Sequence, residues 1–169
     1  MKKIAGLIVA LLLVSAVGPS AFAAGDIAAG RAITPMVEVR YIDETHHKDV
    51  RIFISNISNA TVDCCVNFYS YDGDKENSNI KVYTGNDSGW RAILDTKENV
   101  FSIPAHSSRF VKIDRTSNKE QWKFGYAVID WTCENKMVNK PLMAVLQTAY
   151  QQNGNSNEGM FAVNGGQPF

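Results

Sequence analysis

The acidic loop at residues 72–77 holds residue types that suit a chemical role. Asp72, Asp74 and Glu76 alternate along it, and hard cations such as Ca²⁺ bind several oxygens that converge from one loop. The loop glycine follows Asp72 directly, whereas an EF-hand loop carries its glycine at the sixth position. The pattern favours solvated turn residues, and a calcium site at the three carboxylates is the alternative.

Aromatic side chains in polar surroundings are the second candidate, because a flat ring can stack on a sugar. Trp90 lies in the polar stretch DSGWRA and is therefore the predicted ligand-binding residue. Carbohydrate-binding modules use such exposed rings flanked by Asn, Asp and Gln side chains. Trp122 and Trp131 lie in an apolar stretch and are expected to pack in the core or at its edge.

The cysteines Cys64, Cys65 and Cys133 form an odd set, so one thiol is left over if a disulfide forms. An exported chain meets an oxidising compartment, which predicts a bridge from Cys133 to either Cys64 or Cys65, with free thiols as the alternative. Neighbours in a strand point to opposite faces, so Cys64 and Cys65 cannot both reach one partner. No C-x-x-C motif is present, which removes the usual zinc and thioredoxin-like signals.

The histidines His46, His47 and His106 are the candidates for a catalytic base, and none lies in a recognisable motif. The chain also lacks a G-x-S-x-G nucleophile elbow. All three histidines fall in polar or turn-like stretches, so surface and turn positions are expected. The sequence therefore predicts a protein that is not an enzyme and that uses no cofactor, apart from the Ca²⁺ alternative.

The first 23 residues have the parts of a secretory signal peptide. Lys2 and Lys3 precede an apolar run at residues 4–17, and an A-x-A cleavage signal ends at Ala23. The run is too short for a comfortable membrane span, so we expect an exported bacterial protein, periplasmic or secreted, that is not an integral membrane protein. Basic and acidic residues are balanced at 17 each, which predicts no nucleic-acid partner.

Most of the remaining chain alternates apolar and polar residues with the period of a half-buried strand. Residues 49–73 are predicted to form two strands joined as a hairpin, with Asn56 and Ser58 as turn formers. Gly125 is expected to mark a bulge or a close backbone approach. Residues 142–151 favour a strand, although their Leu, Met, Ala and Gln also suit a helix. Further strands are predicted at residues 36–42, 80–83, 90–94, 99–103, 108–113 and 122–132.

The stretches ISNISNATVDCCVNFYSYDG, FSIPAHSS and GYAVIDW together resemble the Ig-like or fibronectin-type domains of bacterial exported proteins. The resemblance implies an all-β, antiparallel Ig-like β-sandwich of about seven to nine strands. The resemblance spans roughly residues 37–150, and we expect the sandwich domain at residues 36–152, after a signal peptide at 1–23 and a flexible lead-in at 24–35. Residues 153–169 are expected to be an Asn- and Gly-rich tail with room for a short final strand.

Such sandwiches host many unrelated activities, so the resemblance implies no particular one. The first prediction is a non-catalytic exported protein that acts by protein–protein or cell-surface contacts, using exposed strand edges for β-augmentation. The alternative is a carbohydrate- or ligand-binding module that uses the aromatic residues near Trp90. The third and least supported alternative is an uncharacterised enzyme, because the sequence shows no recognisable set of catalytic residues.

Overall fold

The computed structural model describes residues 27–77, 80–84, 93–94, 99–113 and 121–169. Within these residues the chain is all-β, with every pair of strands antiparallel and one 3-10 turn, η1 (Val163–Gly166). The predicted all-β antiparallel class is thereby confirmed. The described strands are β1 (Ala28–Ile33), β2 (Val37–Asp43), β3 (His46–Asn56), β4 (Val62–Ser70), β5 (Ile80–Tyr83), β6 (Ile93–Leu94), β7 (Val100–Ile103), β8 (Ser108–Ile113), β9 (Gln121–Cys133), β10 (Leu142–Gln152) and β11 (Asn155–Ala162).

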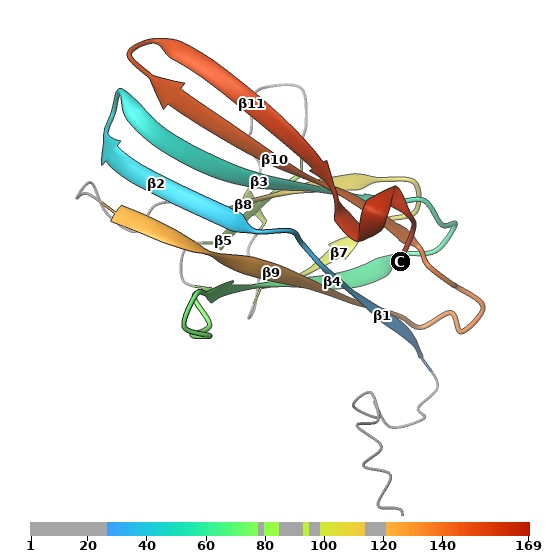
Figure 1. The fold of residues 1–169 in the computed structure, drawn as a ribbon. Helices are drawn as coiled ribbons and strands as arrows, with labels where there is room; N and C mark the ends of the chain where they lie inside the picture. Colours follow the sequence, from blue (N-terminus) through green and yellow to red (C-terminus); the bar gives the residue numbers. More distant parts are fainter. Residues whose placement is uncertain (1–26, 78–79, 85–92, 95–98, 114–120) are drawn as a thin grey trace, which may run out of the picture.

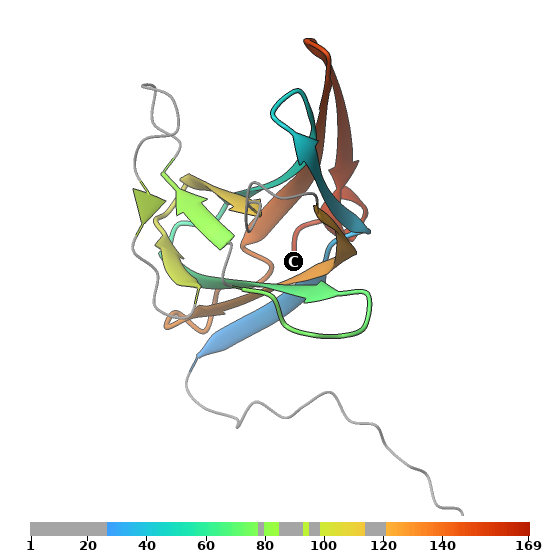
Figure 2. The ribbon, with the colours of Figure 1, turned by 90° about the vertical axis from the view of Figure 1, so that its left-hand side faces the viewer.

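The strands form one sheet that curls over on itself into a nearly closed, barrel-like shape (Figures 1 and 2). On one side of the core lies the β9 layer, which consists of β7, β4, β9 and β1. On the other side lies the β3 layer, which consists of β6, β5, β8, β3, β10 and β11. Strand β2 pairs with both β9 and β3 and so joins the two layers.

The core lies between the two layers, because each long strand turns one row of apolar side chains inward. Burial of a side chain such as Leu or Ile contributes roughly 1.5–3 kcal/mol, so this cluster supplies most of the drive to fold. Strand β10 belongs to it, which confirms a strand rather than a helix at residues 142–151. The largest contributors from the two layers are Ile52, Ile54, Leu142, Leu146, Phe68, Ile103 and Ile129.

The hairpin predicted at residues 49–73 is wrong in its pairing, although both of its strands exist. Strand β3 pairs with β2, β8 and β10, whereas β4 pairs with β7 and β9. The connection at residues 57–61 therefore crosses from the β3 layer to the β9 layer. Alternation shows that each strand buries one face. It does not show whether two such strands are hydrogen-bonded neighbours in one sheet or face each other from opposite sides of the core.

Asn56, the last residue of β3, anchors this crossing and is only 2% exposed. Its Nδ2 donates hydrogen bonds to the carbonyl oxygens of Ala60 at 2.7 Å, Ile103 at 3.0 Å and Pro104 at 3.1 Å. Its Oδ1 accepts from the backbone N and the Oγ of Ser58, which is an Asx-turn. Asn56 and Ser58 are thus turn residues, as predicted, and Asn56 also ties this crossing to the β7–β8 connection.

Both ends of the described chain contribute strands, so the predicted domain limits at residues 36 and 152 are too narrow. Strand β1 lies in the expected lead-in and pairs with β9, and β11 lies in the expected tail and pairs with β10 along its whole length. These two strands raise the count above the predicted seven to nine. Phe169 is buried and exchanges two backbone hydrogen bonds with Leu142, at 2.9 and 3.1 Å.

Strand β1 was not predicted because its residues are mostly small and do not alternate between apolar and polar types. Gly30 lies opposite Trp131 in the ladder, and a Cβ atom on Gly30 would lie 2.5 Å from the indole Nε1. The indole therefore lies where a side chain of β1 would otherwise be. A stretch of Ala and Gly is typical of a flexible segment. Here the packing against the indole requires these small residues.

Candidate functional site

The three carboxylates predicted as calcium ligands follow β4, and each has its own surroundings. Asp72 accepts a hydrogen bond from the Ser70 hydroxyl, which lowers the pKa of Asp72. Glu76 forms an ion pair with Lys123 of β9. Among the described residues, no group of three or more His, Cys, Asp or Glu side chains is placed to hold one metal ion. The structure thus does not bring the three side chains to a common point.

The predicted ligand-binding residue Trp90 belongs to the segment between β5 and β6 and lies outside the described residues. Its role in stacking stays a prediction. Trp131, by contrast, is buried in the core, as expected from its sequence context.

All three cysteines are free in the structure, so neither predicted bridge is formed. Cys64 and Cys133 are buried, and the Cys133 thiol donates to the carbonyl oxygen of Thr61 at 3.3 Å. Burial raises the pKa of the Cys64 thiol, which keeps it protonated and unreactive. Cys65 is partly exposed and accepts a contact from Asn67 Nδ2 at 3.5 Å.

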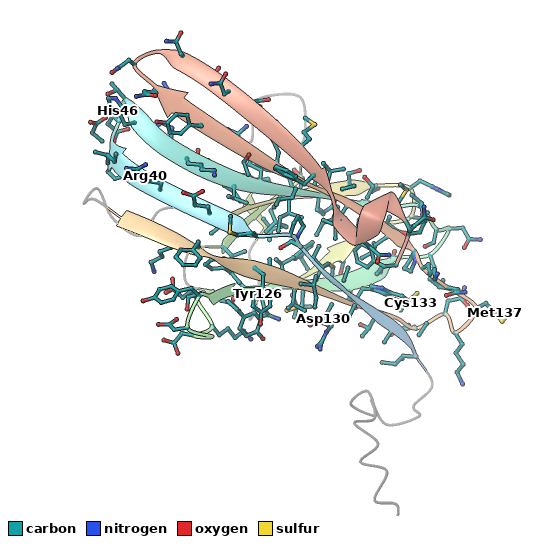
Figure 3. All side chains as sticks on the ribbon, viewed as in Figure 1. Arg40, His46, Tyr126, Asp130, Cys133 and Met137 are labelled. Atoms are coloured by element: carbon teal, nitrogen blue, oxygen red, sulfur yellow. The ribbon has the colours of Figure 1, made fainter. Side chains whose placement is uncertain are left out.

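The histidines lie at opposite ends of β3. His46 begins the strand, beside the β2–β3 turn (Figure 3), and its Nδ1 lies 3.1 Å from Asp43 Oδ1. Hydrogen bonds from Thr45, and then from His46, lower the pKa of Asp43 to about 2. The backbone N of His106 donates to the Ser58 carbonyl oxygen beyond the other end of β3. The full strand separates the two, so His46 and His106 do not share a site.

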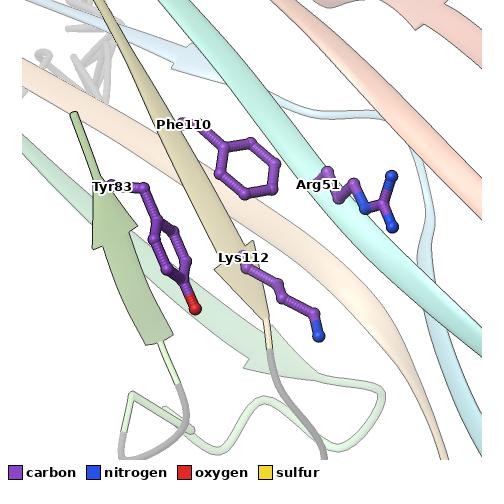
Figure 4. A pocket seen from close by; sticks show the side chains of 4 residues that line it. All are labelled: Arg51, Tyr83, Phe110 and Lys112. Atoms are coloured by element: carbon purple, nitrogen blue, oxygen red, sulfur yellow. The ribbon is translucent and has the colours of Figure 1, made fainter. Parts of the chain in front are cut away.

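A hollow on the outside of the β3 layer brings together four side chains from β3, β5 and β8 (Figure 4). Arg51, Tyr83, Phe110 and Lys112 line this outer hollow, which has a volume of about 190 Å³. Arg51 lies opposite Lys112 in the β3–β8 ladder, and Tyr83 lies opposite Phe110 in the β5–β8 ladder. The alternation in each strand's sequence indicates which side chains point outward. Only the register between the strands shows which of these side chains lie next to each other.

The walls of the outer hollow differ in character. Phe110 is only 4% exposed, with its ring centroid 5.0 Å from that of Phe53 and 5.3 Å from that of Tyr83. Arg51 Nη1 lies 3.5 Å from Gln147 Oε1, at the outer limit of a hydrogen bond. Lys112 Nζ lies 3.5 Å from Asp49 Oδ2. One wall is therefore a packed aromatic row and the other is cationic.

A second feature is the free edge of β11. Strand β11 pairs with β10 on one side, and no other described strand pairs with its opposite side. Met160 is 66% exposed and Phe161 is 50% exposed on it. The strand contains neither Lys nor Pro, the residues that commonly block an edge against further pairing. An unpaired row of backbone N–H and C=O groups is thus flanked by large apolar side chains.

The tip of the β10–β11 hairpin projects beyond the rest of the sheet (Figures 1 and 2). It holds an open polar hollow of about 460 Å³. Amide side chains dominate its lining, with one aromatic ring among them. The lining residues are Tyr150, Gln152, Asn153, Asn155, Ser156 and Asn157.

In the described part of the chain, no helix has the length and apolar character that a membrane crossing needs. No protein-family model, curated protein or solved structure matches this chain. What the protein can bind therefore follows from the chemistry of its own surfaces.

Proposed function

We propose that this chain is an exported, non-catalytic protein that acts by contact with another protein, through addition of a strand to β11. The observation that carries the proposal is the free β11 edge with its exposed Met160 and Phe161. A monomer that leaves such an edge unblocked offers a template for a partner strand. The signal-peptide pattern at residues 1–23 supports export.

The proposal includes an Ig-like sandwich in the broad sense. The β3–β4 and β7–β8 connections each run from one layer to the other, as connections in Greek-key sandwiches do. This topology supports the resemblance seen in the sequence. The continuous pairing through β2 makes the sheet more closed than two separate layers would be.

Strand addition to β11 has two sources of affinity. The backbone of a partner strand would satisfy the N–H and C=O groups on the free side of β11. Successive side chains of β11 point to opposite faces, so Met160 and Phe161 would contact the partner on both faces of the extended sheet. The backbone supplies affinity and the side chains supply selectivity.

Replacing both Met160 and Phe161 by lysine is expected to abolish capture of the partner from envelope extracts, because a charged edge disfavours pairing. Met137→Lys is the matched control, since Met137 is 88% exposed in the β9–β10 connection and points away from the sheet (Figure 3). In the captured complex, the exchange of β11 amide hydrogens should slow by at least roughly tenfold. Capture that survives the double lysine variant, or a complex without protection of β11, contradicts the proposal.

The second candidate is a carbohydrate-binding module, and the polar hollow at the β10–β11 tip favours it. Tyr150 supplies a ring among Asn and Gln side chains, the composition expected of a sugar site. Tyr150→Ala should then remove binding on a glycan array, and Trp90→Ala tests the aromatic residue predicted from sequence. Tyr71→Ala is the control, because Tyr71 is also exposed but stacks on Phe124. An array without signal for the unaltered protein excludes this candidate for the glycans displayed.

A further inference from the structure

We infer that the partner proposed for β11 is a second copy of this chain, paired edge to edge in an antiparallel register centred on Gly159. The inference rests on the strand addition proposed above and names its partner. Two copies related by a two-fold axis use the same surface, so the edge of β11 must be complementary to itself. Its backbone groups, its charge and its side chains each meet this condition.

The turn of the β10–β11 hairpin decides which backbone groups of β11 point to its free side. Only Asn153 and Gly154 separate the paired residues Gln152 and Asn155, and both have positive φ, at 49° and 82°. A two-residue turn of this kind is closed by a hydrogen-bonded pair, after which hydrogen-bonded and non-hydrogen-bonded pairs alternate along the ladder. The odd-numbered residues of β11 therefore bond β10. The backbone groups that point to the free edge belong to Ser156, Glu158, Met160 and Ala162.

A register centred on Gly159 pairs all of these edge groups with one another. With Gly159 opposite its own copy, Glu158 lies opposite Met160 of the second copy. In the same register, Ser156 lies opposite Ala162 of the second copy. A register centred on Glu158 or on Met160 would instead set one end of β11 opposite a residue outside β11. Centring on Gly159 thus satisfies the whole free edge within the two strands.

The charge of β11 also favours this register. Glu158 is the only charged residue of the strand, and its carboxylate accepts a hydrogen bond from Gln147 Nε2 at 2.8 Å within its own chain. Like charges placed directly opposite each other in a ladder are destabilising, which disfavours a register centred on Glu158. In the register centred on Gly159, each Glu158 faces an uncharged methionine.

The side chains of β11 fill the space that the paired glycines leave. A Cβ atom on Gly159 would lie 3.4 Å from Cε2 of Phe161, so the phenyl ring leans along the strand toward Gly159. In the pair, the two phenyl rings lean toward the central glycines from opposite ends and cover them, as aromatic side chains do for glycines at sheet edges. Phe161 is 50% exposed and Met160 is 66% exposed in the single chain, so pairing removes apolar surface from water on both faces of the sheet.

The position of β11 leaves room for a second copy. Strand β11 forms an outer edge of the molecule, away from β9 and β4 (Figures 1 and 2). None of the other described strands pairs with its free side. Contact along one strand edge is small compared with the interfaces of permanent dimers, so the pair should dissociate on dilution.

Sedimentation equilibrium of the purified protein from about 5 µM to about 1 mM should show a monomer–dimer equilibrium. Over the same range, exchange of the amide hydrogens that point to the free edge should slow by at least about fivefold as the concentration rises. These are the amides of Ser156, Glu158, Met160 and Ala162.

Two variants of one position test the register. Met160→Lys places an ammonium opposite Glu158 of the second copy, and Met160→Glu places a carboxylate there, with two such pairs in each dimer. Because opposite charges across a ladder attract and like charges repel, Met160→Lys should self-associate about tenfold more tightly than Met160→Glu. Added salt should narrow this difference. Met137→Lys and Met137→Glu, at an exposed residue of the β9–β10 connection, are the matched controls and should associate as the unaltered protein does.

The inference is overturned if the protein stays monomeric over this range, if it dimerises without protection of β11, or if the two Met160 variants associate equally. A protein that stays monomeric but is captured through β11 by a different chain keeps the proposed function and loses only this inference. Absence of both self-association and capture removes both.

Discussion

Gly125→Ala is expected to lower the free energy of unfolding by on the order of 3–5 kcal/mol, enough to remove much of the stability of a domain this size. Gly125 lies in β9 between Val37 of β2 and Ser70 of β4. A Cβ atom there would lie 1.8 Å from the carbonyl oxygen of Tyr69 and 2.9 Å from its carbonyl carbon. These are backbone atoms of the β4–β9 ladder, so relief requires separating paired strands.

Urea unfolding followed by tryptophan fluorescence measures this effect. Gly159→Ala is the matched control, because it adds the same methyl group to a strand glycine whose nearest neighbour is the end of the Thr148 side chain, at 3.1 Å. We expect that control to change the unfolding free energy by less than about 1 kcal/mol. If Gly125→Ala proves equally mild, the close backbone approach is not a constraint on the fold.

Asn56→Ala is expected to cost about 2–4 kcal/mol, because it leaves the buried carbonyl group of Ile103 and the partly buried ones of Ala60 and Pro104 without their donor. Asn56→Asp keeps the shape of the side chain but places an oxygen where Nδ2 faces these three acceptors. It should therefore destabilise at least as much as alanine does. Thermal or urea unfolding of the two variants measures both effects.

The comparison of the two variants identifies the cause. If Asn56 only filled space, aspartate would be nearly neutral and alanine would be the worse substitution. Asn157→Ala serves as the control, because Asn157 is an exposed asparagine of β11 and should change stability by less than about 0.5 kcal/mol. An aspartate variant as stable as the unaltered protein would remove the hydrogen-bonding role assigned to Asn56.

Sequence alone was sufficient where a strand buries one face and exposes the other. The alternation around Ile52 and Val66 indicated β3 from residue 49 onward and β4 near its observed limits, the strand predicted at residues 108–113 matches β8, and the aromatic and β-branched run at residues 122–132 indicated β9. The glycine in that run was correctly expected to mark a close backbone approach. These features are local, since each depends on residues a few positions apart.

Strand β1 was missed, and the last strand was expected only as a short one, for a different physical reason. Residues of β1 are small because the indole of Trp131 packs against Gly30, and β11 is exposed on much of its surface, so neither sequence shows the apolar–polar alternation of a half-buried strand. Backbone hydrogen bonds to β9 and β10 hold these two strands in place. Because this free energy comes from partner strands and not from the strands' own side chains, it leaves no pattern in the local sequence.

The sequence by itself determined the all-β class, the positions of the central strands and the turn chemistry of Asn56, because side-chain alternation and turn preference act over a few residues. Only the tertiary structure decided that β3 and β4 face each other across the core. It also decided that Arg51 and Lys112 meet beside Tyr83 and Phe110 in the outer hollow. Register between strands distant in the chain depends on how the whole core packs, and a one-residue shift would send each of these side chains to the opposite face.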